Sequence, residues 1–194
     1  MASCSVPLTG AAAARLYDDH VDAVHAMVTR RVGPQRSPAI TGEAFEHALR
    51  TWDRFDADRG TERLFLYGAA AATLRRHQGV ETEHLRALRT DRSSTTAITD
   101  PLIGGPRPPR PNSVEGVHGT SVEHDEHDES PARTMLRAIA DLSPDDRDIV
   151  LLALWESLPH GAIAEALDLS VGTVRSALGR IRRELKVATA GTTE

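Results

Sequence analysis

The chain has 194 residues, of which 23 are Lys or Arg and 28 are Asp or Glu, for a formal net charge of −5 at pH 7. That length suffices for one large domain or two small ones with a buried core. The single cysteine, Cys4, excludes an intrachain disulfide framework and a cysteine-based zinc site. No apolar run approaches the ~20 residues of a membrane span and no export signal is visible, so we expect a soluble cytoplasmic protein.

The first ninety residues carry apolar side chains at helical spacing. Gly33 and Pro34 should end the first helix, because Gly is common just after the last helical residue and Pro cannot continue a helix. Thr41 and Thr61 are the expected N-caps of the second and third helices. The four predicted helices cover residues 11–32, 41–55, 61–77 and 81–89.

The middle of the chain has a different composition. Nine of the twenty residues from Asp100 to Gly119 are Pro or Gly, and six consecutive His, Asp and Glu residues follow at 124–129. Residues 90–130 carry 3 basic and 8 acidic side chains, so their net charge of −5 equals that of the whole protein. Such a segment buries too little apolar surface to offset its ordering entropy. We therefore predict a flexible acidic linker over residues 91–130.

The last 64 residues again indicate helices, over 132–142, from Ser143 onward, over 159–167 and from Ser170 onward. Ser143 followed by Pro144 and two aspartates is a strong helix start, since Ser caps, Pro fits the first position and acids favour the helix dipole. No two-residue alternation predicts a strand. The expected fold class is all-α, with two small helical domains over 1–90 and 131–194 joined by the linker.

Residues 159–178 form the most informative pattern. A short predicted helix with the small residue Ala164 at its packed centre precedes a tight turn at Asp168, and a longer helix follows. This order is typical of a helix-turn-helix, whose second helix enters the DNA major groove. From Arg175 to Lys186 the sequence has five basic residues and one acidic residue, a local net charge of +4 in a protein whose total charge is negative. The alternative reading is a plain amphipathic hairpin with a solvated Arg face.

Residues 135–152, together with 163–167 and 170–176, resemble region four of bacterial sigma factors, the region that binds promoters. Residues 45–55 are similar to the part of region two that docks on the clamp helices of the polymerase β′ subunit, and residues 65–77 to the part that opens the −10 element. The short chain with only these two regions and a linker resembles the extracytoplasmic-function group. By this resemblance, the linker either threads toward the polymerase channels or serves as a simple tether.

The resemblance implies a protein without catalytic chemistry or cofactor that binds core RNA polymerase through the β′ clamp helices and the β flap, binds promoter DNA, and is controlled by an anti-sigma factor. In the −35 major groove we expect contacts to base edges and phosphates from Thr173, Arg175, Ser176, Arg180, Arg182, Arg183 and Lys186. The single-stranded −10 element requires cationic and stacking groups, for which the candidates are Arg59, Arg63, Arg75, Arg76 and His77. Polymerase docking is assigned to Phe45, Leu49, Trp52 and Phe55, with a core role as the alternative.

Two other classes of function compete with this interpretation. His118, His124 and His127 could ligate a metal, although a Pro- and Gly-rich segment offers no rigid support for such a site. A helix-turn-helix regulator that does not replace sigma, or a sigma-like protein that acts mainly through protein contacts, is the second alternative. A nucleophilic enzyme has less support, because the chain has no Gly-x-Ser-x-Gly motif around a serine.

Overall fold

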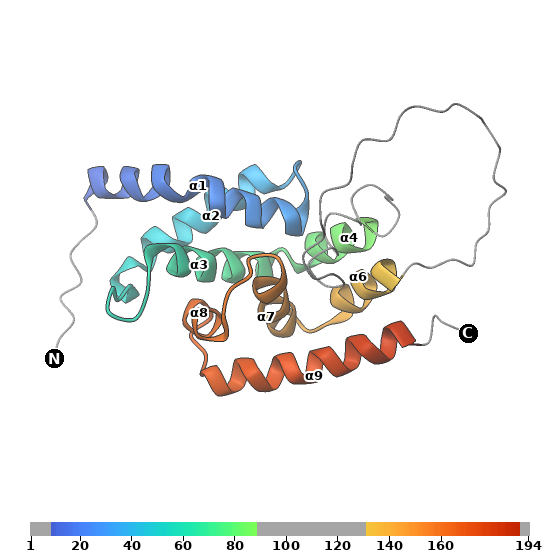
Figure 1. The fold of residues 1–194 in the computed structure, drawn as a ribbon. Coiled ribbons are helices and arrows are strands. Elements are labelled where there is room, and N and C mark those ends of the chain that lie inside the picture. Colours follow the sequence, from blue (N-terminus) through green and yellow to red (C-terminus); the bar gives the residue numbers. More distant parts are fainter. Residues whose placement is uncertain (1–8, 89–130, 191–194) are drawn as a thin grey trace, which may run out of the picture.

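The computed structural model describes residues 9–88 and 131–190, and the segments outside these ranges are not discussed further (Figure 1). The predicted linker and its histidines lie outside the described residues. Within the described residues every regular element is a helix, which confirms the all-α fold class. The described residues fall into two parts, which we call the N-terminal half (9–88) and the C-terminal half (131–190).

The N-terminal half contains α1 (Gly10–Val32), α2 (Ser37–Arg50), the short 3₁₀ helix η1 (Trp52–Arg54), α3 (Glu62–Arg76) and α4 (Gln78–Leu88). The C-terminal half contains α6 (Pro131–Asp141), α7 (Pro144–Leu154), α8 (His160–Ala166) and α9 (Val171–Ala190). Helices α1, α2 and α3 pack side by side, α8 lies against α3, and α6 lies against α4 (Figure 1). Helix α9 runs along the opposite side of the body, against α6, α7 and α8.

Capping residues set several helix starts, and Thr61 and Ser143 do so as the sequence predicts. The Thr61 hydroxyl accepts a hydrogen bond from the Leu64 backbone N–H at 3.3 Å, and Ser143 does the same for the Asp146 N–H at 3.2 Å. Each cap satisfies an N–H that the first helical turn leaves without a partner. Helix α1 ends at Gly33, whose φ of 80° is accessible to glycine at little cost.

The predicted start of the second helix was wrong. Helix α2 begins at Ser37 and not at Thr41, because Pro38 occupies its first turn, where proline is favoured. Thr41 lies inside the helix, where it is buried and its hydroxyl is 3.2 Å from Nδ1 of His25. The helix also ends earlier, at Arg50, since the chain tightens into η1. Helix α4 starts before the predicted residue, at Gln78.

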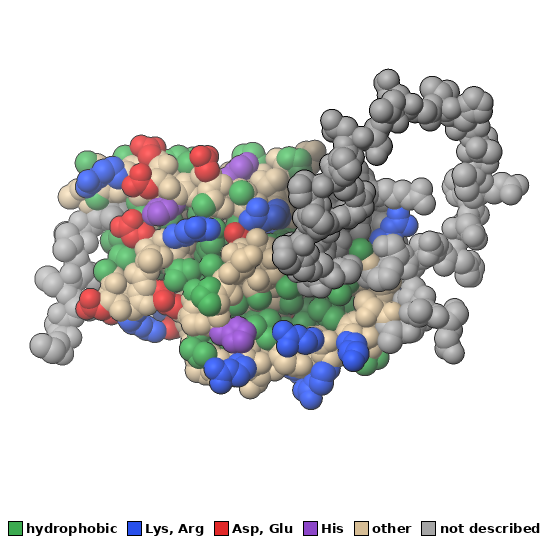
Figure 2. Space-filling model, viewed as in Figure 1, with side chains coloured by type: hydrophobic (Ala, Val, Ile, Leu, Met, Phe, Trp, Pro, Cys, Tyr) green, Lys and Arg blue, Asp and Glu red, His purple; other side chains and the backbone are tan. Residues whose placement is uncertain are grey.

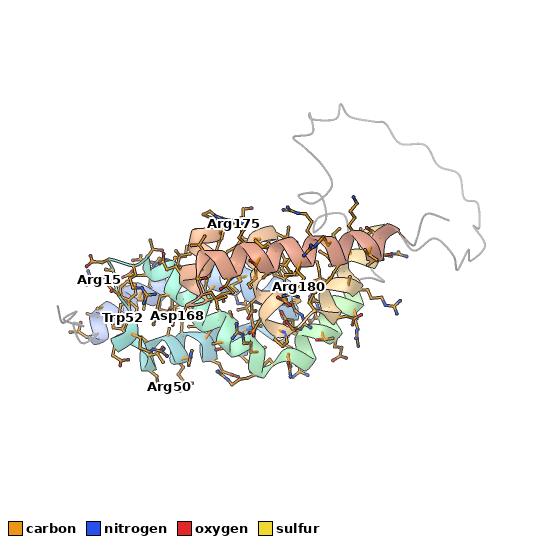
Figure 3. All side chains as sticks on the ribbon, turned by 90° about the horizontal axis from the view of Figure 1, so that it is seen from below. Arg15, Arg50, Trp52, Asp168, Arg175 and Arg180 are labelled. Atoms are coloured by element: carbon orange, nitrogen blue, oxygen red, sulfur yellow. The ribbon has the colours of Figure 1, made fainter. Side chains whose placement is uncertain are left out.

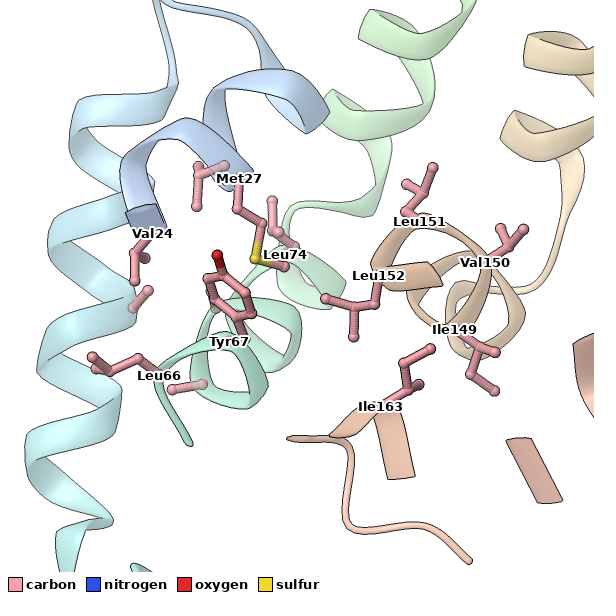
Figure 4. Close-up of a cluster of buried hydrophobic side chains, with 14 of the residues drawn as sticks. Val24, Met27, Leu66, Tyr67, Leu74, Ile149, Val150, Leu151, Leu152 and Ile163 are labelled. Atoms are coloured by element: carbon pink, nitrogen blue, oxygen red, sulfur yellow. The ribbon is translucent and has the colours of Figure 1, made fainter. Parts of the chain in front are cut away.

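The two halves share one hydrophobic core. Met27 and Leu74 come from the N-terminal half, Leu152 and Ile163 from the C-terminal half, and all four are at most 2% exposed. Figure 4 shows Leu152 of α7 reaching between the two sets of side chains. The interface between the halves is therefore a packed layer and not a loose contact between separate bodies.

Four charged side chains are buried within this layer. Arg31 of α1 donates to Glu81 of α4, and its Nη2 donates to Oδ1 of Asp148 of α7 at 2.5 Å. Arg147 Nη1 donates to the second oxygen of Glu81 at 3.1 Å. All four side chains are at most 5% exposed. We call them the buried ion network, and it ties three helices from both halves together.

Arg31 keeps its charge despite burial. Burial alone disfavours the charged form of Arg31, but the carboxylates of Glu81 and Asp148 more than offset this effect and raise the pKa of Arg31 above its usual range. Arg147 also donates from Nη2 to the Ala140 carbonyl at 2.6 Å and to the Leu142 carbonyl at 3.1 Å. It thereby satisfies carbonyls at the end of α6 that have no helical partner.

Replacing Arg31 with Met should lower the free energy of unfolding by roughly 3–5 kcal/mol, because two carboxylates would stay buried without their partner. Urea denaturation followed by circular dichroism measures this change. Arg50→Met is the matched control, since Arg50 is 60% exposed and pairs only with Glu46, one turn away; there we expect a change within about 0.5 kcal/mol. Equal effects of the two substitutions would show that the network does not stabilise the fold.

Candidate nucleic-acid interface

Helices α8 and α9 form a helix-turn-helix. The turn between them contains Asp168 with a φ of 53°, a left-handed conformation that Asp tolerates better than most residues. The Leu169 N–H donates to the Ala164 carbonyl at 2.7 Å, which closes the end of α8. Ser170 then caps α9, accepting from the Thr173 N–H at 3.0 Å. Ala164 is 3% exposed, so the predicted small residue of α8 is buried.

Helix α9 presents a polar face to solvent. Its buried face consists of Val174, Ala177, Ile181 and Leu185, spaced three or four residues apart. The seven residues predicted to contact the −35 element are all exposed. Arg175 projects from the first turns of the helix, away from the core (Figure 3). Ser176 and Arg183 fall on the same outward side by helical spacing.

Arg180 differs from the other basic residues of α9, because it is already paired. Its Nη1 and Nη2 donate to the two oxygens of Asp146 at 2.9 and 2.7 Å, and Glu184 lies 3.6 Å away. The hydrogen bonds from Arg180, and then that from Ser143, lower the pKa of Asp146 and outweigh the effect of burial, so this carboxylate is charged near neutral pH. Arg180 would have to leave Asp146 to reach a base.

The residues predicted to contact the −10 element lie on α3, at its end and in the loop before it. Arg76 and His77 contact Glu43 of α2, with His77 Nε2 2.9 Å from the carboxylate. Arg63 donates to the Tyr67 hydroxyl at 2.8 Å. Arg59 and Arg75 instead pair with carboxylates of the C-terminal half. Of these five residues, Arg59 and Arg75 line a common cavity, whereas Arg76 and His77 face α2. Each of the five has a partner within the protein.

A cavity of about 310 Å³ lies between α3 and α8. Cationic side chains from the N-terminal half line one wall, and Glu165 and Asp168 of the C-terminal half line the other. Burial, and then the charges of the nearby arginines Arg76, Arg50 and Arg54, lower the pKa of His47 on the same wall. The N-terminal wall of this cavity is therefore electropositive, as a nucleic-acid surface requires.

The four residues assigned to polymerase docking separate into two environments. Phe45 is 4% exposed and its ring lies 4.8 Å from that of Tyr17, so it belongs to the core. Leu49 is 42% exposed. Trp52 stacks on Phe55 at 4.6 Å and meets Phe65 edge-on at 5.5 Å, and all three rings are half-buried. Leu49 and this aromatic cluster, at the end of α2, remain available for a partner.

A second concavity lies in the C-terminal half and was not foreseen from the sequence. It has a volume of about 820 Å³ between α6, α7 and α9, with an apolar lining that includes Met135, Val150 and Leu154. His160, Arg182 and Lys186 stand at its rim. Hydrophobic side chains border the row of Lys and Arg side chains on this face (Figure 2). From the sequence, Arg182 and Lys186 are four residues apart and share one face of α9. Only the packing of α6 and α7 against α9 shows that this face borders an apolar groove.

The described residues contain no cluster of three His, Cys, Asp or Glu side chains that could hold a metal ion. Within the same residues, no helix combines the length and the apolarity that crossing a bilayer requires. The histidines of the alternative metal site lie at 118–127, outside the described residues.

Residues 132–185 match the family model described as "Sigma-70, region 4". Among solved structures, the chain is similar to the sigma factor RpoE of Bartonella quintana, determined in complex with the anti-sigma factor NepR, with 13% sequence identity and a TM-score of 0.49 over 90% of this chain and 94% of that chain. Among curated protein sequences, none matches the chain.

The family match covers α6 to α9 almost completely, including the buried face of α9 and the helix-turn-helix. It thus coincides with the segment where turn geometry, caps and exposed cationic residues indicate a DNA-binding unit. Residues 132–185 are therefore similar to sigma-70 region 4, and this similarity covers the C-terminal half of the described residues.

Proposed function

We propose that the protein is a sigma factor of the extracytoplasmic-function group, which binds core RNA polymerase in the cytoplasm and directs transcription from specific promoters. The observation that carries the proposal is the capped helix-turn-helix inside the segment similar to region 4, with an outward face of cationic and hydroxyl side chains on α9. A sigma factor needs no catalytic group of its own, since it supplies sequence recognition to the polymerase.

In this proposal α9 enters the major groove of the −35 element. Arg175 reads a guanine edge, because a guanidinium can donate two parallel hydrogen bonds to that base. Thr173 and Ser176 fix the register on the backbone, and Arg182, Arg183 and Lys186 neutralise phosphates. Arg180 joins them after release from Asp146.

The N-terminal half acts as region two in this proposal. Its cationic residues Arg59, Arg63, Arg75, Arg76 and His77 hold the opened −10 strand, with stacking surfaces beside them. Leu49, Trp52 and Phe55 form the docking surface for the β′ clamp helices. The apolar groove with its cationic rim offers a second surface for polymerase, for which the β flap is the expected partner. An anti-sigma factor would act by covering one of these surfaces.

Reconstitution tests the proposal as a whole. Purified protein should bind core RNA polymerase in a pull-down, and sequencing of the promoter DNA bound by the complex should yield a common −35 element. On such a promoter the protein should direct RNA from a fixed start site, while core polymerase alone should not. Binding to specific DNA without binding to polymerase would instead favour a helix-turn-helix regulator.

Arg175→Glu should weaken binding of the polymerase complex to that promoter by about 10- to 100-fold, because a base contact worth ~1–3 kcal/mol is lost and a charge is reversed near phosphate. Electrophoretic mobility shift at fixed salt measures the loss. Arg15→Glu is the matched control, since Arg15 is exposed on α1, which lies on the opposite side of the body from α9 (Figure 1). Equal promoter affinity for both variants would contradict the placement of α9 in the groove.

A further inference from the structure

Two exposed aliphatic side chains stand at the turn of the helix-turn-helix. Leu169 is 37% exposed and Val171 is 42% exposed, on either side of the capping residue Ser170. Single exposed aliphatic residues are common on protein surfaces, so the position of these two is what matters. The turn leads directly into α9, the helix that is proposed to enter the major groove. Apolar groups therefore lie where the proposed function places base edges.

Val171 is well placed to reach a base beside the one assigned to Arg175. It is the first residue of α9, and the first residues of a recognition helix are those that contact base edges. Arg175 follows four residues later on the same side of the helix, about 6 Å further along its axis. Successive base pairs of B-DNA are about 3.4 Å apart. If Arg175 holds a guanine, Val171 therefore lies over a base about one or two pairs away.

The outward side of α9 is low enough for such a contact. Gly172, Ser176 and Gly179 are all exposed there, and a Cβ added to Gly179 would meet nothing within 4 Å. Glycine inside a helix is disfavoured relative to alanine, and packing within the described residues does not require it at this position. Small residues let a ligand approach the helix closely. The helix can then come near enough for Val171 to reach a carbon–carbon contact of about 3.5–4.0 Å.

The chemistry of valine selects one base. Its side chain has no hydrogen-bond donor or acceptor, so it can distinguish bases only by apolar contact. In the major groove thymine presents a C5-methyl group, whereas the other three bases present hydrogen-bonding groups without a methyl. Valine placed over those polar groups would remove water from them and return no hydrogen bond, which is unfavourable. A thymine methyl is therefore the group that fits Val171.

We propose that Val171 reads the methyl group of a thymine in the −35 element, one or two base pairs from the guanine held by Arg175. This inference rests on the proposed function. It adds a specificity-determining residue to the cationic and hydroxyl residues assigned to α9 above, and it predicts a thymine at a defined place in the promoter. Leu169, on the other side of Ser170, adds apolar surface at the same end of the helix.

Removing the methyl group from the DNA tests this contact. Deoxyuridine in place of thymine lacks only the C5-methyl and keeps every hydrogen-bonding group of the base pair. It is introduced at one thymine of the −35 element at a time, in a promoter recovered with the polymerase complex. At one of these positions the affinity of the complex should fall about three- to fivefold, as expected for the loss of one buried methyl group. Electrophoretic mobility shift at fixed salt measures this ratio.

Truncating Val171 assigns the contact to this residue. The complex that contains Val171→Ala should bind the thymine and deoxyuridine promoters equally, because the side chain that distinguishes them is gone. The variant should fold, since Val171 is exposed and alanine favours a helix more than valine does. Val187→Ala is the matched control, since Val187 is 75% exposed on α9 about 24 Å further along, and it should keep the full ratio. A ratio that Val171→Ala leaves unchanged would overturn the inference.

The outcomes separate this inference from the proposed function. If the polymerase complex binds a specific promoter and deoxyuridine weakens binding at none of its −35 thymines, the sigma function stands and the methyl contact is overturned. If no specific DNA is recovered with polymerase, both fail. If Val171→Ala weakens binding to core polymerase in the pull-down and leaves the promoter ratio unchanged, the exposed apolar residues serve a protein partner and the inference is overturned.

Discussion

The buried ion network is the interaction on which the arrangement of the molecule depends. It consists of Arg31, Glu81, Arg147 and Asp148, which come from α1, α4 and α7 and are each at most 5% exposed. Burying charges is costly unless each has a partner, so this network specifies one relative placement of the halves. That placement decides which cations face solvent: those of α9 do, whereas Arg59 and Arg75 of the N-terminal half meet carboxylates.

This asymmetry separates the two sets of cationic side chains. The polar side chains of α9 are exposed, and among them Arg180 pairs with Asp146 of the same half. Arg59 and Arg75 of the N-terminal half instead pair with carboxylates of the C-terminal half. Under the proposed function, α9 meets DNA directly, whereas Arg59 and Arg75 must first exchange these carboxylates for phosphates.

Local chemistry explains which parts of the fold were predictable. Thr61, Ser143 and Ser170 each cap a helix, and hydrophobic spacing identified the buried face of α9, so local sequence sufficed there. The predicted start at Thr41 was wrong, because Thr is a common capping residue whereas the helix begins four residues earlier, at Ser37 and Pro38. The pairing of Arg75 with Asp148 could not be predicted, since 73 residues separate the partners and only tertiary packing joins them. Close packing explains the alanine-rich middle of α3: Ala69, Ala70 and Ala71 are buried, and Gly68 lies against Ala166 of α8.

The distance between the two halves tests the central claim most directly. Spin labels at Arg15→Cys on α1 and Val187→Cys on α9, in a Cys4→Ser background, report this distance by double electron–electron resonance. The free protein should give one narrow distance distribution, and the complex with core polymerase and promoter should give a distance longer by tens of ångströms, because −35 and −10 elements about 25 base pairs apart lie roughly 85 Å apart along B-DNA at 3.4 Å per base pair. An identical distance in both states would contradict the account.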